Sequence, residues 1–356
     1  MDAKSKILIR RLKDNPILIH TTIGIVAGYF LLHPITMVIY WFEISNTRVT
    51  FNGILEAFIE RFMHAFYVHM MPMSLVFIVI GGLSGLGSGL YFRKIRNQKE
   101  ELRILNEKKD HYLSIISSDL ETASDYIESL LPEEIYTNDL QINWKIVPSA
   151  QLGGDSFGYH WIDNDHLAIY ILDVAGHGVS AALLSVSVLN TLKFQSLVNI
   201  NFRYPDQVLE GLNNVFQMTD HYSMFITMWY CVYCRSKQEI RCGGAGHPPF
   251  LIFKPDGKLY RIPSQNTMVG AEADYRFHYE TIQIMENSIL YLYTDGVFEI
   301  KLPNGMWLEI EDLENFLSEN LKKHTDELDV LYNHIVDLNA GNTLDDDFTI
   351  IKIHLR

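Results

Sequence analysis

The sequence predicts an α+β fold, with layers of sheet and helix, that follows two membrane-spanning helices and a charged helical linker. Three observations predict it. Two long apolar runs lie within residues 1–92, a charged amphipathic stretch covers 93–132, and short β-like runs alternate with helical segments over 133–356. We therefore divide the chain at these boundaries into a membrane anchor, a signalling helix and a C-terminal domain.

The composition narrows the range of partners. The chain has 356 residues, 48% of them hydrophobic, and a formal net charge of -14 at pH 7. Nucleic acid is bound through clustered Lys and Arg, so this acidic balance argues against a nucleic-acid partner. The three cysteines, Cys231, Cys234 and Cys242, are too few for a disulfide scaffold and indicate a reducing compartment.

Two apolar runs are candidate membrane spans. The first covers about residues 17–41 and the second about 65–92, and roughly 20 apolar residues suffice to cross a bilayer. The second run ends in the small residues 81–89, which let helices pack closely in lipid. The alternatives are a cleaved signal peptide for the first run and two buried soluble helices for the pair.

The flanking charges indicate the orientation of these spans. The connector around residues 43–64 has few basic residues, whereas both outer flanks are basic. The positive-inside rule therefore predicts a multi-pass protein whose two ends and C-terminal domain are cytoplasmic. The flanking basic residues are Lys4, Lys6, Arg10, Arg11 and Lys13 before the first run, and Arg93, Lys94, Arg96 and Lys99 after the second.

The stretch 93–132 is typical of a long helix. Apolar residues recur at about heptad spacing, although Lys109 and Asp119 interrupt the seam. This pattern predicts a weak parallel coiled coil over residues 93–130, and hence a homodimer. A solvated amphipathic linker without a partner is the alternative. Pro132 is expected to end the helix. The seam residues are Ile95, Leu102, Leu105, Tyr112, Ile116, Ala123 and Leu130.

Beyond Pro132 the expected elements are short. The apolar helix expected at 180–192 and the one or two helices expected over 311–338 interrupt a series of strands. Strand clusters interrupted by helices indicate an α+β domain. The strands are expected at 167–172, 224–233, 249–254, 282–284, 289–294 and 348–355.

Four acidic motifs lie beside these strands. Carboxylates at the ends of apolar strands are costly unless they are exposed in a turn or paired with a cation. Each motif alone is typical of a common turn. If the strand ends that carry these aspartates meet at one edge of the fold, their carboxylates would form a cluster of hard oxygen ligands, which suits Mg²⁺ or Mn²⁺ rather than zinc. The motifs are Gly153-Gly154-Asp155, Asp173 followed by Gly176-His177-Gly178, Asp295-Gly296, and Asp345-Asp346-Asp347.

Five motifs in order carry a family resemblance. From about Asp119 to the C-terminus the chain resembles the PPM metal-dependent serine/threonine phosphatases, in the bacterial branch that includes the sporulation phosphatase SpoIIE and the stress regulator RsbU. The resemblance implies an α-β-β-α sandwich. The motifs are Gly153-Gly154-Asp155, Asp173-Val174-Ala175-Gly176-His177-Gly178, Gly244-Ala245-Gly246-His247-Pro248-Pro249, Tyr293-Thr294-Asp295-Gly296-Val297 and Asp346-Asp347-Phe348-Thr349.

The resemblance also implies roles for single residues. It implies a hydrolase with two Mn²⁺ or Mg²⁺ ions that activate a water and hold the phosphoryl oxygens. Asp173 would bridge the ions and the Val174 carbonyl would help hold one, whereas Asp155 would bind the second ion, directly or through water. Asp295 and Asp346 would complete the first. Two assignments stay open: Asp347 could exchange roles with Asp346, and His177 is either a catalytic general acid or a histidine that fixes the turn.

The resemblance further implies a substrate, a partner and a location. The expected substrate is a phosphoserine or phosphothreonine on a small anti-sigma-factor antagonist of the STAS type, and the expected location is the cytoplasmic membrane of a bacterium. A catalytically silent membrane receptor or scaffold with the same fold is the main alternative. A diguanylate cyclase would also explain residues 153–157, but not the other motifs. A zinc site of the three cysteines is disfavoured, because Cys231 and Cys234 should point to opposite faces of a strand.

Overall fold

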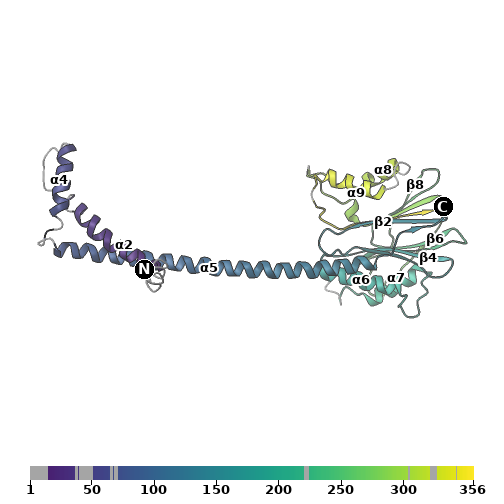
Figure 1. Cartoon of the computed structure of the whole chain (residues 1–356). Helices are drawn as coiled ribbons and strands as arrows, with labels where there is room; N and C mark the ends of the chain where they lie inside the picture. Colours follow the sequence, from purple (N-terminus) through teal and green to yellow (C-terminus); the bar gives the residue numbers. More distant parts are fainter. Residues whose placement is uncertain are drawn as a thin grey trace. The chain divides into compact units, whose positions relative to one another are not determined.

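The chain divides into two compact units, Met1–Ile115 and Ile116–Arg356. The computed structural model describes residues 15–36, 39, 51–64, 67, 71–219, 224–303, 305–320, 327–341 and 343–356 (Figure 1). The boundary between the units falls inside the stretch 93–132 that the sequence separates as a signalling helix. That three-part division stays a prediction.

The first unit is helical. Helix α2 (Pro16–Ala27) continues through a π-helical turn, η1 (Gly28–Leu32), to Thr36, and α4 (Phe51–His64) precedes the start of α5 (Met71–Leu130). Proline at the first turn of α2, together with a capping hydrogen bond from the Leu18 N–H to Asn15 Oδ1 at 3.4 Å, explains why this helix begins at Pro16.

Two helices are long and apolar enough to cross a membrane by length and composition, Pro16–Thr36 and α5. They fall on the two spans expected at about 17–41 and 65–92. Residues 37–38, 40–41, 65–66 and 68–70 of those spans lie outside the described residues. Membrane crossing therefore stays a prediction.

Glycines let the two candidate spans approach each other. A Cβ built on Gly81 would lie 2.1 Å from the backbone oxygen of Gly24, and a Cβ on Gly85 would lie 2.2 Å from the oxygen of His20. Gly89 continues the same face four residues on, where a Cβ would lie 2.5 Å from the Ile17 Cα. This spacing of small residues every four positions brings two helix backbones into direct contact.

The helix α5 runs through the expected junction at residue 92 without a break and ends at Leu130, two residues before Pro132. Its end was therefore predicted correctly. The seam residues Leu105 and Tyr112 are 61% and 64% exposed. Such an apolar seam is available to a second helix, but the coiled coil itself stays a prediction.

The second unit is built on two antiparallel sheets. One has the strand order β1-β2-β11-β10-β7-β8 and the other β3-β4-β5-β6-β9. The strands of the first sheet are β1 (Ile135–Tyr136), β2 (Leu140–Val147), β7 (Phe250–Phe253), β8 (Leu259–Ile262), β10 (Ser288–Tyr293) and β11 (Phe348–Leu355). Those of the second are β3 (Ser156–Trp161), β4 (His166–Val174), β5 (Ile226–Cys234), β6 (Glu239–Ala245) and β9 (Glu280–Gln283).

Helices cover the outer faces of both sheets, as Figure 1 shows. Helices α6 (Val179–Lys193) and α7 (Pro205–Val215) pack on the second sheet, and α8 (Ile310–Asn320) and α9 (Glu327–Leu338) pack on the first. The α+β fold with two antiparallel sheets is confirmed. The order of its layers is the predicted α-β-β-α sandwich.

The alternation of side chains along β4 explains why this strand lies inside the sandwich. Ala168, Tyr170, Leu172 and Val174 pack against α6 and α7, whereas Leu167, Ile169 and Ile171 face the other sheet. A strand buried on both faces has an almost continuous apolar sequence, because successive side chains point to opposite sides. The apolar run before Asp173 is this signal.

Most predicted elements are confirmed within a few residues. The helix at 180–192 is α6, the strand at 348–355 is β11, and 311–338 forms the two helices α8 and α9. Helix α7 and five strands, β1, β2, β3, β6 and β8, were not predicted from the sequence. Several of these lie at sheet edges or contain polar and glycine residues, so their apolar pattern is weak.

The contact between the two candidate spans can be tested in the full chain by substitutions in α5. We expect Gly81→Leu to separate the helices, because its side chain would meet the Gly24 backbone, whereas Gly87→Leu should be tolerated, because nothing lies within 4 Å of a Cβ there. Overpacking of this kind costs roughly 1–3 kcal/mol or more. The measurement is the temperature at which the full chain in detergent loses its monodisperse gel-filtration peak. Equal temperatures for both variants would contradict the helix contact.

Candidate metal centre

Four strand ends bring the predicted aspartates to one end of the sandwich. Strand β3 pairs with β4 so that Ser156 lies opposite Leu172, and this places Asp155 beside Asp173. In the other sheet, Tyr293 of β10 lies opposite Ile350 of β11. The end of β10, which leads to Asp295, therefore lies beside the start of β11, which follows Asp346 and Asp347. The structure brings together all five predicted aspartates.

Asp155 links the two sheets. Its side chain is 6% exposed, and the Thr294 hydroxyl donates a hydrogen bond of 2.7 Å to its Oδ2. Thr294 follows β10, so this bond joins the Gly-Gly-Asp turn of one sheet to the Asp-Gly turn of the other. Burial, with the nearby charge of Asp173, raises the pKa of the Asp155 carboxyl well above its usual value.

Asp173, Asp295 and Asp346 also have raised pKa values. Burial raises the pKa of Asp173 to about 7, and the charges of Asp295, Asp346 and Asp347 add to this effect. Partial desolvation of the carboxylate is the main cause for Asp295 and for the more exposed Asp346, and the charge of Asp295 adds to the rise at Asp346. Like charges held together favour a bound cation, because its charge offsets their repulsion.

Asp347 has a different environment from Asp346. Its Oδ1 accepts hydrogen bonds from the Ser149 N–H at 2.8 Å and the Ser149 hydroxyl at 3.0 Å, and its Oδ2 accepts one from the Gly154 N–H at 2.7 Å. The side chain of Asp347 is thus engaged by the loop that carries Asp155. Asp346 is exposed, and its Oδ1 accepts a hydrogen bond from the Asp347 N–H.

Two glycines of the motifs make room for Asp347. A Cβ on Gly153 would lie 2.5 Å from Asp347 Oδ2, and a Cβ on Gly296 would lie 2.0 Å from the Asp347 backbone oxygen. Both contacts are too close for any other residue. The glycines beside Asp155 and Asp295 therefore serve the close approach of the segment before β11.

The turn after Asp173 lies at the surface. Gly176 and Gly178 adopt φ values of 107° and 81°, which other residues rarely adopt. His177 lies between them and is exposed. The Val174 backbone oxygen would lie 2.8 Å from a Cβ on Gly154, so this carbonyl faces the Gly-Gly-Asp turn. The structure thus places the Val174 carbonyl beside the Gly-Gly-Asp turn, and His177 in an exposed turn four residues after Asp173.

His247 is a structural residue of the site. Its ring is buried: Nε2 donates a hydrogen bond to the Tyr293 backbone oxygen at 3.1 Å, and Nδ1 accepts one from the Thr227 hydroxyl at 2.8 Å. Burial lowers the pKa of His247 to about 3, so the ring is neutral. Thr227 lies opposite Asp173 in the pairing of β4 with β5. His247 therefore connects β5, which pairs with the strand that carries Asp173, to β10, which leads to Asp295.

The donor set fits hard divalent cations. All side-chain donors of the cluster are carboxylate oxygens, which suit Mg²⁺ or Mn²⁺. Among the described residues, three potential ligand atoms lie within 4.8 Å of one another in a different group, Asp165, His166 and Cys234.

Three residues with a role here escaped the sequence analysis: Thr294, Ser149 and Thr227. Thr294 belongs to the motif Tyr293-Thr294-Asp295-Gly296-Val297, so its position directly before Asp295 could have identified it. Ser149 and Thr227 contact the site from 198 and 20 residues away along the chain, at Asp347 and His247. No local pattern marks such contacts.

Comparisons with known sequences agree with this geometry. The family model of Stage II sporulation protein E (SpoIIE) matches residues 163–356, which begins after the Gly-Gly-Asp turn. Phosphoserine phosphatase RsbU of Bacillus subtilis (strain 168) is 30% identical over 245 residues, 68% of this chain and 71% of RsbU. Phosphoserine phosphatase RsbP of the same organism is 30% identical over 182 residues, 51% of this chain and 45% of RsbP.

Solved structures share the fold. The SiaA-PP2C domain of Pseudomonas aeruginosa superposes with a TM-score of 0.59 and 17% identity, over 68% of this chain and 98% of that domain. The PP2C phosphatase domain of SpoIIE from Bacillus subtilis, solved with a fragment of its regulatory domain, gives a TM-score of 0.51 and 16% identity, over 63% of this chain and 64% of that one. The resemblance in sequence, the sandwich and the aspartate cluster lead to one conclusion: the chain belongs to the SpoIIE family and is a PP2C-type protein phosphatase.

Proposed function

We propose that this protein is a membrane-anchored serine/threonine phosphoprotein phosphatase that depends on two Mn²⁺ or Mg²⁺ ions. The observation that carries the proposal is the meeting of Asp155, Asp173, Asp295 and Asp346 at one end of the sandwich. When bound, the ions supply an activated water and hold the phosphoryl oxygens of the substrate.

We assign the ligand roles from the surroundings of each side chain. Asp173, whose pKa reflects the charges of the other aspartates, would be the ligand that both ions share, and the Val174 carbonyl would help to hold one of them. Asp155 would hold the second ion, and Asp295 with Asp346 would hold the first. These assignments retain the expectation from the family resemblance.

Asp347 is better suited to positioning than to metal binding. Backbone and hydroxyl donors of Ser149 and Gly154 already occupy both of its oxygens. We therefore propose that Asp346 is the ligand of this pair and that Asp347 fixes the turn bearing Asp155. His177 is exposed at the rim, where it is positioned either to reach the leaving group or to shape the turn.

The proposed substrate is a phosphoserine or phosphothreonine on a small regulator of the STAS type, in a partner-switching pathway. Two relatives, RsbU and RsbP, are named phosphoserine phosphatases. The site suits a protein substrate, because Asp346 and His177 are exposed at the surface.

The proposed location is the cytoplasmic membrane of a bacterium, with the catalytic domain on the cytoplasmic side. Of the most apolar windows in the two candidate spans, only 11% and 17% of the residues are buried, so their apolar side chains remain exposed. The core helix of a soluble protein would be covered, and this difference supports lipid as the surroundings.

Within the second unit, the C-terminal part of α5 contacts the loops that carry the aspartates, and we propose that these contacts transmit a signal to the site. The last turns of α5 contact the catalytic loops: Gln151 donates a hydrogen bond of 3.0 Å to the Ser117 hydroxyl. Ile127 and Leu131 line a cavity of about 130 Å³ that also reaches Asp155 and Asp347. We propose that pairing of two α5 helices in a homodimer shifts the last turns of α5, and that this shift moves the aspartates they contact.

Replacement of the proposed bridging ligand tests the metal site. We expect Asp173→Asn to lower Mn²⁺-dependent phosphate release from a serine-phosphorylated STAS protein by at least about a hundredfold, since an uncharged side chain cannot hold both ions. The matched control is Asp345→Asn, an exposed neighbour of the cluster, which should retain activity within about twofold. Full turnover by Asp173→Asn would overturn the assignment.

The raised pKa of Asp173 predicts a dependence of stability on pH. Without added divalent cation, the full chain should melt at a lower temperature at pH 8 than at pH 5. Stability present below the usual pKa of an aspartate is lost as the pH rises through the folded value of about 7. Asp173→Asn should flatten this fall, and Mn²⁺ at pH 8 should raise the melting temperature of the parent more than that of the variant. Identical pH profiles for the two proteins would exclude this role of Asp173.

Crosslinking tests the proposed dimer. We expect Leu105→Cys to form a disulfide between chains in membranes, because Leu105 is 61% exposed on the seam. Glu107→Cys, on the opposite face of the helix, is the control and should crosslink weakly. The native cysteines are buried and do not interfere. If both variants crosslink equally, or neither does, parallel pairing through the seam is wrong.

A further inference from the structure

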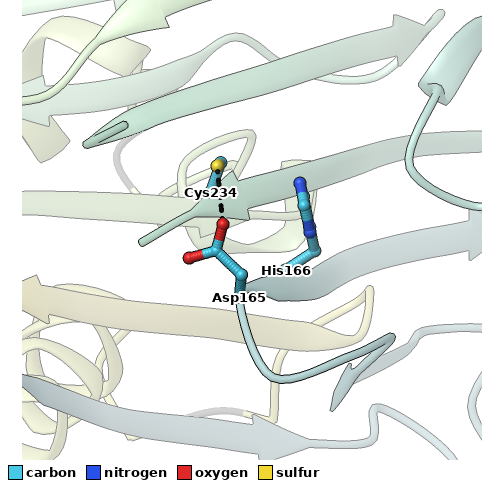
Figure 2. A group of neighbouring side chains, drawn as sticks. All are labelled: Asp165, His166 and Cys234. Carbon is cyan, nitrogen blue, oxygen red and sulfur yellow. Dashed lines mark hydrogen bonds between the residues drawn. The ribbon is translucent and has the colours of Figure 1, made fainter. Parts of the chain in front are cut away.

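A second group of potential metal ligands lies at the far end of β4. His166 begins this strand and faces Cys234, the last residue of β5, as its direct cross-strand partner. Asp165 precedes His166 in the turn between β3 and β4 (Figure 2). Asp173 lies seven residues further along the strand, roughly 23 Å away at about 3.3 Å per residue. The group is therefore separate from the aspartate cluster.

The three side chains converge. One ligand atom from each lies within 4.8 Å of the other two. The Cys234 thiol donates a hydrogen bond of 3.4 Å to Asp165 Oδ2, drawn as the dashed line in Figure 2. Ligands at about 2.0–2.3 Å from a tetrahedral ion are roughly 3.5 Å apart, so the sulfur and oxygen already have a suitable separation.

Neighbouring residues orient two of the three side chains. The Asp163 carboxylate lies 2.9 Å and 3.1 Å from Nδ1 of His166, which leaves Nε2 as the ligand nitrogen. Asp163 is itself held by Arg203 Nε at 2.8 Å. Asp165 accepts hydrogen bonds from the Ser236 N–H at 2.8 Å and its hydroxyl at 2.6 Å. A metal-binding histidine commonly donates its other ring N–H to a carboxylate, which fixes the orientation of the imidazole.

We propose that Asp165, His166 and Cys234 bind one zinc-class divalent cation, with water as the fourth ligand. A thiolate and an imidazole select Zn²⁺ over Mg²⁺ and Mn²⁺, the opposite preference to the aspartate cluster. Binding releases the thiol proton to solvent and replaces the Cys234–Asp165 hydrogen bond with two metal bonds. The thiolate and carboxylate then balance the charge of the ion.

A cation bound by these three residues would link two hairpin turns. Asp165 belongs to the turn between β3 and β4, and Cys234 ends β5 just before the turn to β6. At present these turns are joined by hydrogen bonds, including one from the Arg235 N–H to the Asp165 backbone oxygen at 2.9 Å. His166 has a side chain 15% exposed, which gives an ion access from solvent.

The other cysteines belong elsewhere. Cys231 and Cys242 lie opposite each other in β5 and β6 and are buried between the two sheets. The prediction that the three cysteines do not form one zinc site agrees with this arrangement. Cys231 lies three residues from Cys234 on the same strand, and so provides a matched control.

The test uses the full chain in detergent, kept reduced and titrated with Co²⁺ as a spectroscopic substitute for zinc. We expect one Co²⁺ per chain to give the near-ultraviolet charge-transfer absorption of a thiolate ligand, and Zn²⁺ to abolish it by displacement. Cys234→Ser should lose this absorption, whereas Cys231→Ala and Asp173→Asn should retain it. Because the aspartate cluster has no sulfur, the readout is independent of the phosphatase site and of activity.

Two further variants keep the proposal falsifiable if Cys234→Ser fails to fold. His166→Gln should weaken zinc binding strongly while the protein stays monodisperse. Asp163→Asn should keep the absorption but lower the zinc affinity roughly 10- to 100-fold, the usual cost of losing such support. Absence of the thiolate absorption in the parent chain, or its survival in both Cys234→Ser and His166→Gln, would overturn the proposal.

Discussion

Carboxylates that repel one another are held together at one end of the sandwich because each is attached to a paired strand. Asp155 and Asp173 are fixed by the pairing of β3 with β4, and Asp295 and Asp346 by that of β10 with β11. The raised pKa values of these side chains record the cost of this proximity. The buried layers between and around the two sheets supply the stability that offsets it.

The apolar strands were the part of the fold that the sequence could predict. An uninterrupted apolar run such as 167–172 indicates burial on both faces, and the glycines after it mark where the chain must turn. Strands such as β2 and β3 were missed because polar residues, or Gly158 within β3, weaken their pattern. Helix α7 also escaped, although Pro205 at its first turn is a recognised start signal.

The sequence predicted which residues form the candidate site, but it could not predict the role of each residue. Four motifs at strand ends identified the aspartates, because local sequence marks a strand end. Whether Asp346 or Asp347 faces the cluster depends on Ser149 and Gly154, which lie almost 200 residues earlier and donate to Asp347. The same holds for the group at Cys234: its partner His166 is 68 positions away in the chain and meets it only through strand pairing.

The position of β11 has a consequence for how the enzyme is made. This strand is the last in chain order, yet it lies between β2 and β10 in the middle of its sheet. Asp346 and Asp347 enter the site only when β11 inserts there. A chain in which β11 has not yet inserted therefore has a gap in this sheet, and the Gly154 N–H beside Asp155 lacks its acceptor, Asp347. Catalytic competence is consequently gained only when β11 pairs with both of its neighbours, so the candidate metal centre is completed by the assembly of the sheet itself.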